Sequence, residues 1–230
     1  QDIQLDDNMM TQKEYAKAGE TLKNSLLLNF FISIFLTLVM LFFLFNIKIL
    51  EQPEELIPLI KPYYILQLVS IPLVMPFNSF KQFSDGTTDT ITPMWVMLST
   101  NLLNIIGNYL LIYGHLGFPE LGLTGAGIST LFSRFVSLLL FVILFMKHKR
   151  FQIYLSGFKE GIISFPDIKK LTQIGLPVAA LMAVETGSFS LSVIMMGWLG
   201  SIALAAHQIV SVITTLAFMI YYGIGAAITI

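Results

Sequence analysis

Cysteine is absent from the 230-residue sequence, and charged residues are scarce. Without cysteine, the chain has no disulfide, no thiolate metal site and no cysteine nucleophile. Only 12% of the residues are charged, whereas soluble domains carry about 25%. The formal net charge of −1 provides no basic excess to neutralise phosphates, so we expect no nucleic-acid partner.

Motifs of the common enzyme classes are also missing. His115, His148 and His207 are dispersed and form no metal-binding spacing. No phosphate-cradling loop or nucleophile elbow occurs, and Gly86 with the two threonines after it is predicted to be a loop turn. The sequence therefore predicts no enzyme and no bound cofactor. It favours transport driven by an ion gradient over transport driven by ATP.

Long apolar segments dominate what is present, since 55% of the residues are hydrophobic. A helix needs about 20 mostly apolar residues to cross the hydrocarbon core. Charge-poor windows of that size lie at 24–47, 62–80, 93–114, 122–146, 171–198 and 203–230. Pro72 and Pro76 interrupt the second window, and membrane helices tolerate proline when neighbours satisfy the freed carbonyls. We expect an all-α, polytopic bundle of about six membrane-spanning helices.

The distribution of lysine and arginine predicts the orientation, because these residues accumulate in cytoplasmic loops. With the amino-terminal segment inside, ten of the 13 basic residues lie in or beside the segments 1–23, 81–92 and 147–170. Lys48 and Lys61 lie on the other side, and Arg134 remains within the membrane. We expect an even number of crossings of the cell (inner or plasma) membrane that begin and end in the cytoplasm.

The segment 147–170 is predicted to join two bundles. It contains six basic residues together with Gly157, Gly161 and Pro166. We expect residues 1–150 to form four helices of an amino-terminal lobe, 151–170 a cytoplasmic linker, and 171–230 the first two helices of a second lobe. A long surface loop within one bundle is the alternative.

The two ends of the sequence indicate a piece of a longer protein. No signal peptide follows Gln1, and Ile230 lies inside an apolar run, so we expect an internal piece of a longer membrane protein.

Glu185 is the single formally charged residue between Leu171 and Ile230. An Asp at the centre of a membrane helix costs roughly 2.5–3.5 kcal/mol, so an intramembrane acid is expected to face a polar cavity or partner. Ser188 and Ser192 follow at offsets that share its helical face. A carboxyl group there can hold a proton and release it when a cation or water arrives. A structural acid hydrogen-bonded to a neighbouring helix is the alternative.

Asn101, Asn104 and Asn108 are predicted to share one helical face, because offsets of three and seven residues return to the same side of a helix. Amide oxygens can bind an alkali cation or line a wet cavity. Asparagine also forms ordinary hydrogen bonds between membrane helices, and the spacing leaves both roles open.

The segment 122–130 is rich in small residues, which predicts close helix packing. Thr130, at its end, has a hydroxyl that we expect to reach toward the asparagine face, although no spacing argument requires it. Arg134 lies near the centre of its span and needs a polar partner. Its partner and role stay open.

Several short segments together are typical of one transporter family. They are Gly175-Leu-Pro-Val-Ala, Glu185, Met196-Gly-Trp-Leu-Gly200, Ala203-Leu-Ala-Ala-His-Gln208, Phe83-Ser-Asp-Gly86 before Pro93, and the runs 103–114 and 117–127. In these the chain resembles the multidrug and toxic compound extrusion (MATE) family over about residues 78–230, whereas residues 1–77 agree in hydropathy only. The resemblance implies helices three to eight of a twelve-helix fold with two lobes of six.

The resemblance also implies a function and its residues. Family members export amphipathic, often cationic compounds in exchange for Na⁺ or H⁺, by rocking between outward-open and inward-open states. By position, Glu185 is similar to the coupling carboxylate of the carboxy-terminal lobe. Asn104, Asn108 and Thr130 are similar to the polar partners of an ion site in the amino-terminal lobe. A Na⁺ site near Glu185 or near Asn104 and Asn108 stays open, and no other metal is expected.

The acid that the resemblance implies on the family's first helix is absent from this chain. We therefore expect that the chain does not transport alone, and that its partners are the lipid bilayer, the flanking helices of the same protein and small organic cations or amphipathic drugs. Two other functions are alternatives to drug export. One is a lipid-linked oligosaccharide flippase of related architecture, and the other is a membrane scaffold in which Glu185 and the asparagines only form hydrogen bonds between helices.

Overall fold

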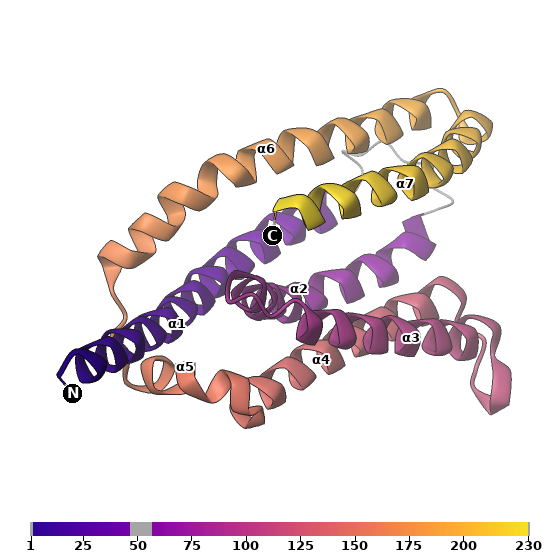
Figure 1. Cartoon of the computed structure of the whole chain (residues 1–230). Coiled ribbons are helices and arrows are strands. Elements are labelled where there is room, and N and C mark those ends of the chain that lie inside the picture. The colour runs from indigo at the N-terminus through magenta and orange to yellow at the C-terminus, as the bar shows by residue number, and fades with distance from the viewer. Residues whose placement is uncertain (1, 47–56, 230) are drawn as a thin grey trace. The chain divides into compact units, whose positions relative to one another are not determined.

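A computed structural model describes residues 2–46 and 57–229, and these are almost entirely helical (Figure 1). No strand occurs among the described residues. The elements are α1 (Asp2–Phe45), α2 (Ile57–Gly86), α3 (Ile91–Tyr113), a short 3₁₀ helix η3 (His115–Gly117), α4 (Gly122–Lys147), α5 (Lys149–Glu160), α6 (Phe165–Trp198) and α7 (Ser201–Thr229). The all-α prediction is confirmed.

Six of the described helices are long and apolar enough to cross a membrane. Their spans are Gln12–Phe45, Ile60–Gly86, Ile91–Tyr113, Gly122–Lys147, Phe165–Trp198 and Ser201–Gly225. These match the six predicted windows, and the chain is a multi-pass membrane protein. Residue 47 at the end of the first window, residue 230 at the end of the last and Lys48 in the predicted outer loop lie outside the described residues.

Proline interrupts neither α2 nor α6. Pro62, Pro72 and Pro76 lie inside α2, and Pro177 lies inside α6. Each proline removes one backbone hydrogen bond from its helix. The helices nevertheless continue through these positions, as the sequence predicted for Pro72 and Pro76.

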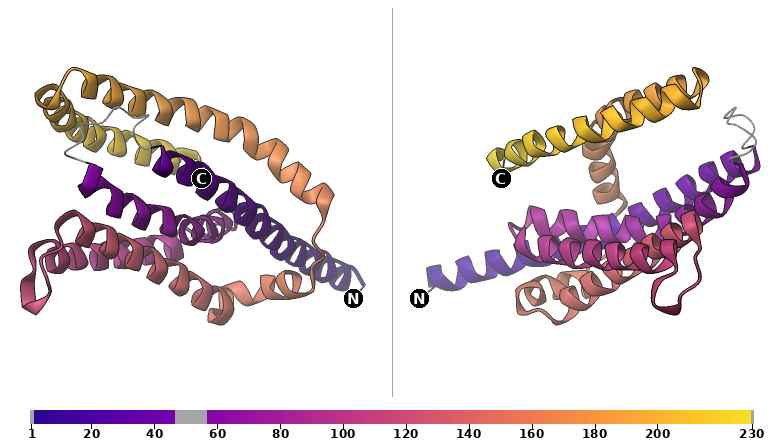
Figure 2. Two further views of the ribbon diagram at one scale, coloured as in Figure 1. Left: turned by 180° about the vertical axis from the view of Figure 1, so that it is seen from behind. Right: turned by 90° about the vertical axis from the view of Figure 1, so that its right-hand side faces the viewer.

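By its internal contacts the chain divides into two units, residues 1–168 and 169–230. In the first unit, α4 packs against α2 and α3, while α1 packs against α2 and α5 (Figure 2). An aromatic core joins them: Phe80 stacks on Phe141 with ring centroids 6.0 Å apart, and Phe145 contacts Phe80 and Phe151. The predicted division into lobes and a linker stays a prediction.

The segment predicted to be a linker contains the helix α5, which packs against α1. A Cβ atom added to Gly157 would collide with the carbonyl oxygen of Ala16, and one added to Gly19 would collide with that of Tyr154. The two backbones therefore approach at the closest distance that helices allow. Phe151 and Tyr154 are buried in the aromatic core, and this burial raises the pKa of the Tyr154 phenol.

Polar contacts fasten both ends of this segment. In the first turn of α5, an Arg150 guanidinium nitrogen lies 3.6 Å from Asp89, whose side chain is only 2% exposed. After α5, Lys23 Nζ donates to the carbonyl oxygen of Gly161 over 2.8 Å, and the Ser164 amide donates to Asn24 Oδ1 over 3.2 Å. These bonds attach the connection between α5 and α6 to α1.

We predict that Gly157→Val lowers the melting temperature of the full-length protein, because the added methyl groups force α5 away from α1. Overpacking of this kind typically costs about 1–3 kcal/mol. Heating the detergent-purified protein and measuring the fraction that remains monodisperse would give the midpoint. Ser156→Val introduces the same side chain at the exposed neighbouring position and is the matched control. Equal midpoints for the two variants would contradict the close approach of α1 and α5.

Candidate functional site

The predicted asparagine face of α3 contacts α4 through hydrogen bonds. Asn104 Nδ2 donates to Ser129 Oγ over 3.3 Å and to Thr130 Oγ1 over 3.4 Å. Asn108 Nδ2 donates to Asn104 Oδ1 over 3.2 Å, and Ser129 Oγ donates to the Asn104 carbonyl oxygen over 3.0 Å. The structure therefore brings Asn104, Asn108 and Thr130 together, with Ser129 as a fourth member. We call these four residues the asparagine cluster.

Asn108 leaves one acceptor of this cluster unused. Its Oδ1 atom is buried, and no donor reaches it among the described residues. A buried amide oxygen without a donor is costly, because it has lost its hydrogen bond to water. The atom is thus available to a cation or to an additional donor. Asn101, by contrast, is exposed on α3 and takes no part in the cluster.

Glycine explains why α3 and α4 come close enough for these bonds. A Cβ atom on Gly107 would collide with Ser129 Oγ, and one on Gly125 would collide with the carbonyl oxygen of Leu111. The small-residue segment 122–130 therefore packs as its composition predicted. Ser129 was missed by the sequence analysis, although its place in the small-residue segment 122–130, directly before Thr130, was a usable signal.

Arg134 finds its polar partners on α2. Its Nη1 atom donates to Gln67 Oε1 over 2.7 Å and also to the hydroxyl of Ser70. Ser70 is buried and Arg134 is half-buried. These bonds join α4 to α2 within the membrane-spanning part of the bundle, which answers the question that the sequence left open about a partner.

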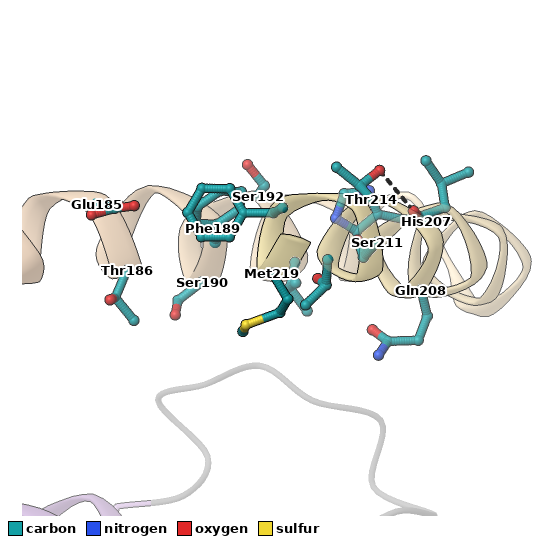
Figure 3. Close-up of a pocket in the computed structure, with 14 residues that line it drawn as sticks. Glu185, Thr186, Phe189, Ser190, Ser192, His207, Gln208, Ser211, Thr214 and Met219 are labelled. Atoms are coloured by element: carbon teal, nitrogen blue, oxygen red, sulfur yellow. Dashed lines mark hydrogen bonds between the residues drawn. The ribbon is translucent and has the colours of Figure 1, made fainter. Parts of the chain in front are cut away.

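In the second unit, Glu185 lines a groove of about 630 Å³ between α6 and α7 (Figure 3). Polar side chains from α6 (Thr186, Ser190, Ser192) and from α7 (His207, Gln208, Ser211, Thr214, Thr215) line it together with Phe189, Val193, Val210, Phe218 and Met219. Glu185 is the single carboxylate among these lining residues, and it is exposed. The groove therefore combines one acid with hydroxyl and amide oxygens and an apolar wall.

The two serines predicted to share the face of Glu185 differ in position. Ser192 lines the groove, but Ser188 does not belong to the lining. Both hydroxyls donate backwards within α6, Ser188 to the Val184 carbonyl oxygen over 2.7 Å and Ser192 to that of Ser188 over 3.0 Å. Their protons are therefore used inside the helix rather than on the carboxylate.

The contribution of α7 to the groove was missed by the sequence analysis. Gln208, Ser211 and Thr215 follow at offsets of three and seven residues, which places them on one helical face. That periodicity was a readable signal, since the rest of this helix is almost entirely apolar. Among the described residues, no group of three or more His, Cys, Asp or Glu side chains could hold a metal ion.

Comparison with known proteins gives the context for these residues. The family model MatE matches residues 8–110 and 177–230. Those ranges contain Asn104, Asn108 and Glu185, whereas Thr130 falls between them. The match also extends the resemblance, since it begins well before residue 78 and includes most of the segment that agreed in hydropathy only.

Three curated relatives have names that refer to drug resistance. The chain is 31% identical over 211 residues to the probable multidrug resistance protein NorM of Photorhabdus laumondii subsp. laumondii, covering 92% of this chain and 46% of the relative. It is 36% identical over 141 residues to that of Brucella suis, covering 60% and 30%. It is 30% identical over 187 residues to the multidrug resistance protein NorM of Vibrio cholerae, covering 81% and 41%. The chain thus spans less than half the length of these relatives.

We predict that Asn104→Ala destabilises the full-length protein more than Asn101→Ala. The first variant removes three side-chain hydrogen bonds of the asparagine cluster, and such bonds in membrane proteins average about 0.6 kcal/mol each. We therefore expect a loss of about 1–2 kcal/mol for Asn104→Ala and a much smaller one for the exposed Asn101. Unfolding in mixed micelles measures both values. Equal losses would show that the cluster does not hold α3 against α4.

Proposed function

This chain belongs to the MatE family, and on that premise we propose that the whole protein is a secondary active transporter. It exports amphipathic and cationic drugs or other toxic compounds in exchange for Na⁺ or H⁺. The names of the relatives, which refer to multidrug resistance, and the six membrane-length helices support this proposal. A membrane potential provides about 2.3 kcal/mol per charge per 100 mV, so exchange needs no ATP site.

Glu185 is the observation that carries the proposal. It is the single formal charge among residues 171–230, and it lines the groove between α6 and α7. A carboxylate in a membrane needs to be neutralised, either by a proton or by a bound cation. A coupling ion and an organic cation therefore compete for the same charge. That competition is the physical basis of exchange, since each binds best when the other has left.

The rest of the groove suits both competitors. Thr214, Thr215 and Gln208 offer hydroxyl and amide oxygens, which are the hard ligands that alkali cations prefer. Phe189 and Phe218 offer aromatic faces, which attract organic cations and bury apolar surface. A drug that is both cationic and apolar would thus contact each kind of surface.

We further propose that the asparagine cluster is part of a second ion site. The buried and unpartnered Asn108 Oδ1 supports this role, because it can accept a hydrogen bond from a protonated acid or coordinate Na⁺. The acid itself would come from a part of the protein outside this chain. In this proposal residues 1–23, 81–92 and 147–170 face the cytoplasm, and the protein has no enzymatic activity.

We predict that Glu185→Gln abolishes gradient-driven export. Cells that express the full-length protein are loaded with a fluorescent cationic dye, and efflux is followed under an imposed Na⁺ or proton gradient at matched expression. The amide keeps the shape of the side chain but cannot exchange a proton or balance a cation. We expect efflux to fall by about tenfold or more, since a loss of about 1.4 kcal/mol already corresponds to tenfold.

Ser188→Ala is the matched control, because Ser188 lies on the same helix but outside the groove lining. The gradient that drives wild-type efflux identifies the coupling ion. If Glu185→Gln folds and exports the dye as well as the wild type does, Glu185 is a structural acid and the proposed coupling is wrong. A non-transporting membrane scaffold would instead export no dye even as the wild type, and its Glu185→Gln variant would still fold and assemble.

A further inference from the structure

Arg134 lies near the middle of the membrane-length helix α4. It is 12 residues from the start of α4 and 13 from its end, so about 18 Å of helix separates it from either terminus at 1.5 Å per residue. The hydrocarbon core extends only about 15 Å to each side of its midplane. A side chain at this position is too deep to reach the phosphate groups of the lipids.

The guanidinium of Arg134 is held by uncharged partners. Gln67 Oε1 and the Ser70 hydroxyl both accept from Nη1, and both belong to α2. A guanidinium has five N–H donors in a planar fork. Among the described residues no hydrogen bond reaches Nε or Nη2. One edge of the fork is thus fixed, and the other edge has no acceptor.

Arg134 also has no ion-pair partner among the described residues. The ion pairs of the described residues join Lys17 with Glu20 and Asp167, Lys81 with Asp85, and Arg150 with Asp89. The spans of α1 to α4 between residues 24–46, 60–80, 91–113 and 122–147 contain no Asp or Glu at all. An arginine within a membrane is expensive unless a partner balances it. The charge of the half-buried Arg134 is therefore not balanced by any acid within these spans.

The neighbouring asparagine cluster does not provide this anion. Thr130 lies one helical turn before Arg134 on the same face of α4, but all members of the cluster are neutral.

We propose that the free edge of Arg134 binds a carboxylate within the membrane. A carboxylate matches the fork with two parallel hydrogen bonds and is the anion that guanidinium recognises best in proteins. Lipid phosphate is excluded by the depth of Arg134. The carboxylate comes either from a side chain of the whole protein outside α1 to α4, or from an acidic compound that enters the membrane part of the protein.

The test uses the full-length protein in lipid nanodiscs and compares the wild type with Arg134→Gln, Arg134→Lys and Ser70→Ala. The Lys variant keeps the charge, and the Ala variant removes one partner of Nη1 without touching the charge. The probe is 2-naphthoate, with the neutral 2-naphthamide as its control. If the site is open to compounds, naphthoate raises the melting temperature of the wild type and of Ser70→Ala. This shift is lost in Arg134→Gln and partly retained in Arg134→Lys, and naphthamide has no effect.

If a carboxylate of the protein already occupies the site, naphthoate gives no shift, and acidification becomes the readout. An acid paired with arginine stabilises the protein only while it is ionised, so lowering the pH through the carboxyl range removes that contribution. The melting temperature of the wild type and of Arg134→Lys should then fall more steeply than that of Arg134→Gln. Parallel pH curves together with no response to naphthoate would overturn the proposal.

This inference does not depend on the proposed function, and the two fail separately. Loss of dye export in Glu185→Gln tests ion coupling and involves no property of Arg134. The response of the melting temperature to naphthoate or to pH tests the carboxylate site and involves no transport. A negative result in one experiment therefore leaves the other conclusion intact.

Discussion

The absence of water from the hydrocarbon core is the constraint on which the rest of this structure depends. Each polar side chain in the six long helices must find its partner within protein, because lipid offers none. Many serines and threonines satisfy the requirement locally, by donating to a backbone carbonyl one turn earlier. Ser33, Ser70, Ser79, Thr100, Ser137, Ser188, Ser192 and Thr214 all do so. A hydroxyl that makes only this bond costs little and specifies no neighbour, whereas those of Ser70 and Ser79 also accept a bond from another helix.

Larger polar groups cannot be satisfied locally, and they therefore specify which helices meet. Asn29 Nδ2 donates to Ser79 Oγ over 2.6 Å and joins α1 to α2, while Arg134 joins α4 to α2 and Asn104 joins α3 to α4. Glycine permits the last of these contacts by letting two backbones approach. Among the groups left over after this pairing, we connect two with function, because Asn108 Oδ1 lacks a donor beside other polar side chains and Glu185 faces an open groove.

The sequence predicted well what depends on segment length and composition. Six helices followed from six apolar windows, because crossing the bilayer requires a fixed number of residues whatever their partners. The common face of Asn104 and Asn108 followed from helical periodicity. The approach of Thr130 to that face came only from the family resemblance, because no spacing within one helix predicts which residue of another helix lies opposite.

The contacts between helices were less accessible from the sequence. The bond from Arg134 to Gln67 joins residues 67 positions apart, and its existence depends on how α2 and α4 align along their axes. The sequence did not predict helix α5, because its segment is rich in basic residues and glycine, a composition that is typical of a loop. Its position depends on Gly19 packing against the backbone of Tyr154 and on Gly157 packing against that of Ala16, and neither sequence region reveals this match alone.

The attachment of α5 to α1 has a mechanical consequence. The segment from 147 to 170 is long enough to form a flexible loop. Instead, α5 packs closely against α1, and the residues after α5 are hydrogen-bonded to Lys23 and Asn24. Because α6 begins at Phe165, the connection between α5 and α6 has little conformational freedom. Within α6, Pro177 lacks the amide that would continue the ladder of backbone hydrogen bonds. Bending of α6 is therefore easiest at this turn, eight residues before Glu185.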